Sequence, residues 1–165
     1  MIKNRELSSA PYGTHLTPLV AAVLKTKGNV VELGMGDYST PILHEICKYE
    51  GRFLVSFEHN KEWLSNFLDL ENNQHIIEYV KNWDEIRINE CGVLFVDHGP
   101  AERRIIEIER FKNLADIIVV HDTDKMKYYG YETVFSKFKY RYKYERYRKS
   151  TTLLSNIIDV SKIFD

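Results

Sequence analysis

The sequence contains few of the features that mark several protein classes. Its only two cysteines, Cys47 and Cys91, lie far apart and lack the spacing of metal ligands, so we predict neither a disulfide framework nor a zinc motif. No apolar run approaches the roughly 20 residues of a membrane span, and residues 1–13 have no apolar core of the signal-peptide kind. A net charge of -1 gives no global attraction to nucleic acid or to anionic membranes. We therefore expect a reduced, cytoplasmic protein without a membrane partner.

Short apolar runs alternate with helical stretches along most of the chain. Strands are predicted at residues 29–34, 53–58, 75–80, 93–98 and 116–122, where β-branched residues concentrate. Helices are predicted at residues 15–27 with Thr17 as N-cap, at 40–51 ending in Gly51, at 60–73 with Asn60 as N-cap, and at 101–114. Such alternation is typical of a parallel sheet with helices on both faces. We predict one doubly wound α/β domain over residues 1–165, with its core in residues 29–160.

The end of the chain breaks this alternation. Residues 139–147 and 151–159 predict an antiparallel hairpin at one edge of the sheet. Residues 137–149 hold seven Lys or Arg against one Glu, which resembles a nucleic-acid-binding surface. The aromatics at 138, 140, 142 and 144 nevertheless alternate with charges at 137, 139, 141 and 143. Period-two alternation favours a half-buried edge strand that ends or bulges near Arg146 and Tyr147.

Polar residues follow four of the predicted strands at the point where each strand ends. They are Glu32, Gly34, Gly36, Tyr38 and Ser39 after the first strand, Glu58 and His59 after the second, Asp97 and His98 after the fourth, and His121 and Asp122 after the fifth. In a doubly wound sheet, ligands bind beyond the carboxyl ends of the strands. A single acid at a strand end is usually a helix cap, but four such ends in register predict a binding cleft.

The residues after the first two strands indicate the kind of ligand. Gly34 and Gly36 would let a ligand approach the backbone, although Ser39 stands where a third glycine would complete a dinucleotide-binding pattern. Glu58 could accept hydrogen bonds from two vicinal ribose hydroxyls and would repel a 2′-phosphate. Together these residues fit a ligand that contains adenosine.

Four segments together resemble the class I S-adenosylmethionine-dependent methyltransferase family, in its small-molecule branch. They are "VVELGMGDYSTPIL" at residues 30–43, "SFEHNKEW" at 56–63, "FVDHGPAERR" at 95–104 and "IIVVHDTD" at 117–124. The resemblance implies a Rossmann-like, mostly parallel seven-stranded sheet with an antiparallel C-terminal hairpin, which dehydrogenases of this type generally lack. It also implies S-adenosyl-L-methionine as the cofactor.

The resemblance assigns cofactor-binding roles by position. Glu32 would hold the methionine amino group, and Gly34 and Gly36 would flank the cofactor, with Tyr38 and Ser39 beside them. Glu58 would bind the ribose, and His59 next to it is a further cofactor-binding candidate. Asp97 would lie beside the transferred methyl group. Asn82 and Trp83 would lie near the adenine, although Trp83 could equally be a packing residue. Thr14, in the segment 13–15, would close over the methionine end of the cofactor.

The acceptor chemistry is less constrained than the cofactor chemistry. His98, His121 and Asp122 are the candidate general bases if the acceptor is a hydroxyl, and Asp97, His121 and Asp122 could instead hold a divalent cation. His98 interrupts the Asp-Gly-Pro pattern of the family, and the chain offers no inserted lid. Arg103 and Arg104 could clamp an anionic substrate, but a solvated helix face is the favoured reading.

We therefore predict an S-adenosylmethionine-dependent methyltransferase that acts on a small or flexible acceptor, more readily at oxygen. One alternative is a cofactor-binding module without catalysis, or a subunit that works as a homodimer or with a partner. A nucleic-acid methyltransferase is a further alternative, but residues 97–100 read Asp-His-Gly-Pro and not the aromatic tetrad used for base amino groups.

Overall fold

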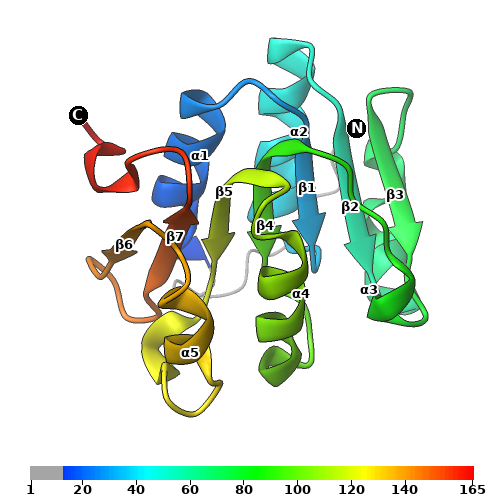
Figure 1. The fold of residues 1–165 in the computed structure, drawn as a ribbon. Coiled ribbons are helices and arrows are strands. Elements are labelled where there is room, and N and C mark those ends of the chain that lie inside the picture. Colours follow the sequence, from blue (N-terminus) through cyan, green and yellow to red (C-terminus); the bar gives the residue numbers. More distant parts are fainter. Residues whose placement is uncertain (1–12) are drawn as a thin grey trace.

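A computed structural model describes residues 13–165, so the segment searched for a signal peptide lies almost wholly outside the described residues. Seven strands form one sheet in the order β3-β2-β1-β4-β5-β7-β6 (Figure 1). The strands are β1 (Val30–Leu33), β2 (Leu54–Glu58), β3 (His75–Tyr79), β4 (Cys91–Val96), β5 (Ala115–Val120), β6 (Tyr140–Tyr144) and β7 (Thr151–Ser155). Neighbours among β1 to β5 pair in parallel, whereas β7 is antiparallel to both β5 and β6. The predicted α/β sheet and its C-terminal hairpin are confirmed.

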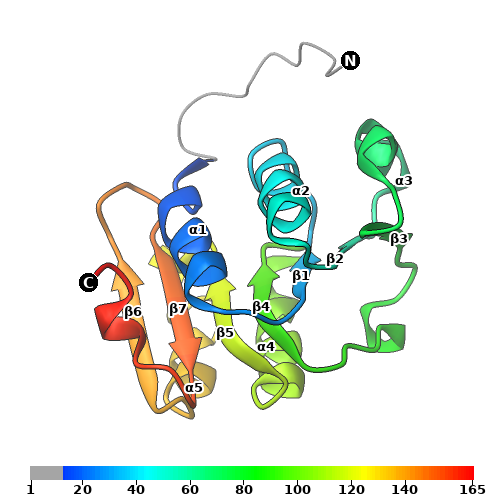
Figure 2. The ribbon, with the colours of Figure 1, turned by 90° about the horizontal axis from the view of Figure 1, so that it is seen from above.

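Helices cover both faces of the sheet, as Figure 2 shows from above. On one face lie α1 (Leu16–Lys25), α2 (Ser39–Glu50) and α3 (Lys61–Leu64); on the other lie α4 (Arg104–Phe111) and α5 (Tyr131–Phe135). Apolar residues of β1, β4 and β5 alternate between two buried clusters, one against α1 and α2 and the other against α4 and α5. The near-continuous apolar runs of these central strands follow from this double covering. Among residues 13–165, no helix is long and apolar enough to cross a membrane.

The observed helix ends agree in part with those predicted from the sequence. Asn60 caps α3 by accepting hydrogen bonds from the backbone N–H groups of Glu62 and Trp63, and Gly51 ends α2 in the left-handed conformation. The predicted cap Thr17 is wrong, because α1 already begins at Leu16 with His15 as its N-cap. The helix predicted at 60–73 is also wrong in extent, since α3 gives way to a 3-10 helix at Ser65–Leu70 that packs Phe67 into a small cluster.

The basic segment near the C-terminus is an edge strand, as its alternation predicts. Phe138 and Tyr144 are buried, whereas Lys139, Arg141 and Lys143 are exposed. β6 ends at Tyr144, slightly before the break in the pattern.

Candidate functional site

The carboxyl ends of β1, β2, β4 and β5 meet at one edge of the sheet, and the first polar group there is Glu32. Its side chain is fully buried and accepts hydrogen bonds from the hydroxyls of Thr40 (3.0 Å) and Ser56 (2.6 Å). Burial raises the pKa of Glu32 to about 7, against the opposing effect of hydrogen bonds from neighbouring hydroxyls. A positively charged group beside Glu32 would favour its ionised form.

A chain of buried polar groups, not predicted from the sequence, continues from Glu32 across the sheet. Ser56 Oγ lies 3.0 Å from His75 Nε2, and the Nδ1 atoms of His75 and His44 lie 3.0 Å apart. Burial lowers the pKa of His75 to about 4, so this ring is neutral at neutral pH. Glu32, Ser56 and His75 lie in three neighbouring strands, at positions whose side chains point to the same face of the sheet. The alternation of side chains along each strand could have predicted that they lie close together.

Glu58 closes the loop that follows β1. One carboxylate oxygen accepts a hydrogen bond from Met35 N (3.1 Å), and the other accepts from His59 N and Asn60 N (both 2.8 Å). The ring of His59 lies against the same carboxylate, 3.0 Å from Nδ1 to Oε1. The acid therefore holds the glycine-containing loop next to the end of β2.

The two glycines of this loop differ in their surroundings. Gly34 has φ +88°, and a Cβ there would lie 2.6 Å from the backbone of His98, so this glycine is needed for packing between β1 and β4. At Gly36, a Cβ would approach only the hydroxyl of Ser39, at 3.3 Å. Gly36 thus leaves its side of the loop open, as close approach of a ligand requires. The ring of Tyr38 lies against Gly13.

Asp97 and His121 form a pair between the ends of β4 and β5. His121 Nδ1 lies 3.0 Å from Asp97 Oδ2, and its Nε2 lies 3.1 Å from the hydroxyl of Thr14. Burial would raise the pKa of Asp97, but the hydrogen bond with His121 and the charge of Arg104 lower it below its usual range. Asp122 follows with left-handed backbone (φ 57°), and its Oδ1 is 3.6 Å from His121 Nε2. Thr14, Asp97, His121 and Asp122 are therefore brought together as predicted neighbours.

His15, for which only the segment 13–15 as a whole was predicted to have a role, extends this group. Its ring is 3% exposed and lies 4.5 Å from the ring of His121, centroid to centroid, in an edge-to-face arrangement. Burial lowers the pKa of His15 to about 3, aided by the nearby His121. Among residues 13–165, neither of its ring nitrogens has a hydrogen-bond partner.

Arg104 supports the site from below and does not face solvent. It is 5% exposed, and its guanidinium donates to the backbone carbonyls of Asp97, His98 and His121. The solvated helix face favoured for this residue is therefore wrong. Arg103 is partly exposed and pairs with Asp84 and Glu107.

His98 and Trp83 lie beneath the cleft. His98 is 1% exposed, and its Nε2 contacts Glu107, which is itself fully buried. Trp83 packs against the His98 ring at 4.3 Å and donates its indole N–H to the carbonyl of Gly99. Asn82 caps the adjacent 3-10 helix (Trp83–Glu85). This placement argues against His98 as a base and favours packing as the role of Trp83.

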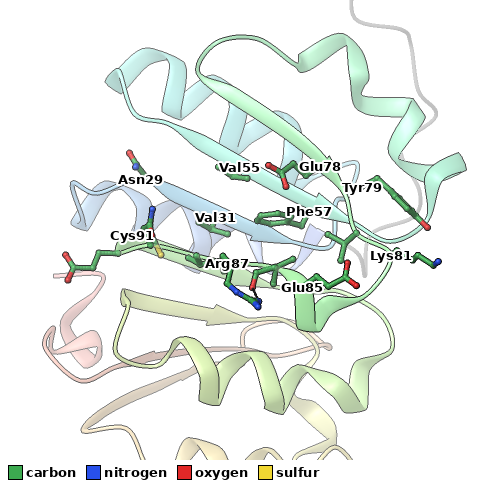
Figure 3. A pocket seen from close by; sticks show the side chains of 15 residues that line it. Asn29, Val31, Val55, Phe57, Glu78, Tyr79, Lys81, Glu85, Arg87 and Cys91 are labelled. Carbon is green, nitrogen blue, oxygen red and sulfur yellow. Dashed lines mark hydrogen bonds between the residues drawn. The ribbon is translucent and has the colours of Figure 1, made fainter.

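Two hollows contact residues of these strands or of the loops that follow them. One, of about 310 Å³, is lined by Asp122, Asp124, Lys125, Tyr129, Arg148 and Lys149, and so opens beside the Asp97–His121 pair. The other, of about 480 Å³, lies on the face that carries α4, where Val31, Val55 and Phe57 rise from β1 and β2 (Figure 3). It exists because the β3–β4 connection, residues 80–90, carries a single three-residue 3-10 helix instead of a covering α-helix.

Solved structures of methyltransferases share this fold. An S-adenosylmethionine-dependent O-methyltransferase from Thermotoga maritima matches with a TM-score of 0.68 at 10% identity, over 94% of this chain and 69% of that one. An O-methyltransferase from Bacillus cereus in complex with SAH matches with a TM-score of 0.62 at 11% identity, over 90% and 82% of the two chains. The O-methyltransferase TomG from Streptomyces achromogenes in complex with SAM matches with a TM-score of 0.62 at 16% identity, over 90% and 81%.

No family model and no curated protein sequence matches this chain. At these identities the structural matches show the fold: a Rossmann-like methyltransferase fold with a mixed seven-stranded sheet. What the chain binds and does has to be argued from its own residues.

Proposed function

We propose that this protein is an S-adenosylmethionine-dependent methyltransferase that acts on a hydroxyl group of a small acceptor. The observation that carries the proposal is the open backbone at Gly36, flanked by the buried acids Glu32 and Glu58 at the ends of adjacent strands. An acid on each side of an open loop suits a ligand with an ammonium group at one end and a ribose diol at the other. The neighbours solved with SAM or SAH share the fold that presents this loop.

Each of the described cofactor residues has a role in this proposal. Glu32 faces the methionine ammonium, Gly36 and Ser39 let the cofactor lie on the backbone, and Glu58 accepts from the ribose hydroxyls. Thr14, held by His121 and by the carbonyl of Lys149, closes the methionine end together with Tyr38. Asn82 and His59 border the adenine, whereas Gly34 and Trp83 support the site by packing.

Methyl transfer from a sulfonium is an in-line displacement, so the enzyme has to align donor and acceptor. On this proposal the acceptor meets the methyl group beside Asp97 and His121, which lie 3.0 Å apart, and it enters through the 310 Å³ hollow beside Asp122. Two routes can then activate the acceptor hydroxyl. His121, oriented by Asp97, can take the proton. Alternatively, Asp97, His121 and Asp122, the ligands expected from sequence, would hold a divalent cation, which would supply a Lewis acid to the hydroxyl.

Calorimetric titration tests cofactor binding directly. S-adenosylmethionine and its demethylated product should bind, and NAD should bind much more weakly. Glu58→Gln should weaken binding by about 1–3 kcal/mol, because the ribose loses a charged acceptor while one side-chain oxygen still accepts backbone N–H groups. Glu78→Gln, on the exposed side of β3, is the matched control and should leave binding unchanged. Preference for NAD would contradict the assignment.

A second measurement separates catalysis from binding. Asp122→Asn keeps a residue that tolerates left-handed backbone, so it should leave cofactor affinity unchanged and lower methyl transfer to hydroxyl acceptors from a compound panel. Full cofactor binding without transfer to any acceptor would favour the rival function, a cofactor-binding subunit whose acceptor arrives on a partner or a second copy. The uncovered hollow of Figure 3 is the observation that favours that rival. A cytoplasmic location is part of the proposal and is consistent with the two buried, free cysteines.

A further inference from the structure

A cluster of three potential metal ligands lies at the carboxyl ends of β4 and β5. His15 comes from the N-cap of α1, Asp97 follows β4 and His121 follows β5, so three separate elements contribute one side chain each. One ligand atom from each of the three residues lies within 4.8 Å of those of the other two. Two of the three residues are almost fully buried: His15 is 3% exposed and His121 2%.

His15 is the residue that hydrogen bonding does not explain. Polar side chains that are this deeply buried nearly always have a partner, and Asp97 and His121 have theirs. Neither nitrogen of His15 has one within residues 13–165, although its ring is directed at His121. The His15 ring also contacts the ring of Phe95, with 4.9 Å between the centroids, and this contact gives its nitrogens no hydrogen-bond partner. A ring nitrogen of His15 would have a partner if an ion bound between His15 and the Asp97–His121 pair.

We propose that His15, Asp97 and His121 bind a divalent transition-metal ion. Two imidazoles with one carboxylate are a ligand set suited to Mn²⁺, Fe²⁺, Co²⁺ or Zn²⁺, whereas Mg²⁺ and Ca²⁺ require mostly oxygen ligands. The 3.0 Å between His121 Nδ1 and Asp97 Oδ2 matches two ligands about 90° apart around an octahedral ion with bond lengths of about 2.1 Å, whereas a tetrahedral ion requires about 3.4 Å. A ligand atom of His15 lies within 4.8 Å of those of Asp97 and His121.

The proposed metal site differs from the cation site expected from sequence, because His15 replaces Asp122 as the third ligand. Asp122 Oδ1 is near His121 Nε2 at 3.6 Å, but its other contact is the ammonium group of Lys149. The role of the metal rests on the proposed function. Because of its position, the metal would bind the acceptor oxygen beside Asp97 and lower the pKa of the acceptor hydroxyl. Arg104 holds the backbone that carries both Asp97 and His121, which fixes two of the three ligands.

Metal binding can be measured without cofactor or acceptor. After treatment with a chelator, the protein is titrated with Zn²⁺ by calorimetry and with Co²⁺ by visible absorption, and Mg²⁺ serves as the comparison. One equivalent of Zn²⁺ or Co²⁺ should bind, and Mg²⁺ should bind far more weakly. His15→Ala should weaken Zn²⁺ binding by more than about 100-fold, since even outer-shell partners contribute about 10–100-fold. His44→Ala removes another buried histidine, from the His44–His75 pair, and should leave Zn²⁺ binding unchanged.

A crystal of the unmodified protein grown with Co²⁺ provides a test that does not depend on any variant folding. Anomalous scattering should place the ion between His15, Asp97 and His121. An ion located elsewhere, no binding of Zn²⁺ or Co²⁺, or equal Zn²⁺ affinity of a folded His15→Ala protein would each overturn the proposal. Titration of the metal-free protein with S-adenosylmethionine keeps the two conclusions separate, because cofactor binding without metal binding refutes the metal site alone.

Discussion

The guanidinium of Arg104 lies 2.9 Å from the carboxylate of Asp97 and also donates to the backbone carbonyl of the same residue. Further hydrogen bonds reach the carbonyls of His98 and His121. One side chain at the start of α4 therefore fixes the ends of both β4 and β5. The positions of the candidate reacting groups depend on this arginine, although it does not face the cleft.

Loss of Arg104 should destabilise the protein strongly. Arg104→Met leaves Asp97 without its buried cation and leaves three carbonyls with fewer donors, so we expect the free energy of unfolding to fall by about 3–5 kcal/mol. Lys112→Met, which breaks the surface pair with Glu109, should cost less than about 1 kcal/mol. Urea unfolding followed by circular dichroism measures both. Similar losses in the two variants would show that Arg104 is not the residue that secures these strand ends.

The two loop glycines should respond differently to the same substitution. Gly34→Ala combines a positive φ with a Cβ placed 2.6 Å from the backbone of His98, and we expect it to lower stability by at least about 2 kcal/mol. Gly36→Ala meets only the movable hydroxyl of Ser39, so stability should change by less than about 1 kcal/mol. Affinity for S-adenosylmethionine should nevertheless fall more than about tenfold in Gly36→Ala. Unchanged affinity in this folded variant would mean that the cofactor does not approach the loop.

The pKa of Glu32 makes cofactor affinity depend on pH. Burial raises this pKa from 4.5 to about 7, so the free protein holds a proton on Glu32 in mildly acidic solution. A methionine ammonium beside the carboxylate favours the ionised form, and binding below pH 7 must then release a proton. We expect S-adenosylmethionine affinity to rise roughly tenfold per pH unit up to about pH 7 and then level off. Calorimetry in buffers of different ionisation enthalpy measures the released proton, which should be absent in Glu32→Gln.

Stability provides an independent check on the same group. Because the folded-state pKa is raised, the stability associated with protonated Glu32 is fully present below about pH 4.5 and is lost as pH rises through 7. The loss amounts to roughly 3 kcal/mol at about 1.4 kcal/mol per unit of pKa. Glu32→Gln should remove this decline from the pH profile of unfolding. A decline of equal size in Glu32→Gln would assign it to another group.

The sequence was sufficient for the sheet and for the list of residues at its carboxyl edge. Runs such as residues 93–96 have to be buried on both faces, and parallel strands that alternate with helices bring their ends to one edge. For this reason the sequence alone groups Glu32, Glu58, Asp97 and His121 at one edge. The limits of the helix at 60–73 could not be predicted, because the packing of Phe67 against Leu64 and Ile77 decides the local geometry.

Side-chain direction explains most of what the sequence did not reveal. The pattern after β4 places both Asp97 and His98 at the binding edge, yet successive residues point to opposite sides, and His98 turns to Glu107 beneath the sheet. His15 and His121 are 106 positions apart, and their contact depends on how α1 crosses the end of β5. Likewise, no local pattern shows that the guanidinium of Arg104 is directed inward and that of Arg103 toward Asp84.

The basic edge strand provides the last prediction. Lys139, Arg141 and Lys143 are exposed on β6, the outermost strand of the sheet, while Tyr144 on the same strand is buried. Charged side chains on an edge strand oppose pairing with the edge of another molecule. The triple variant with Gln at these three positions should therefore bind S-adenosylmethionine as the native protein does, because β6 is remote in sheet order from β1 and β2, but it should self-associate more. Sedimentation velocity measures the association and calorimetry measures the cofactor affinity.

If the native protein instead binds DNA or RNA in a salt-dependent way that the triple variant loses, the charges form a nucleic-acid surface and the alternative of a nucleic-acid methyltransferase gains support.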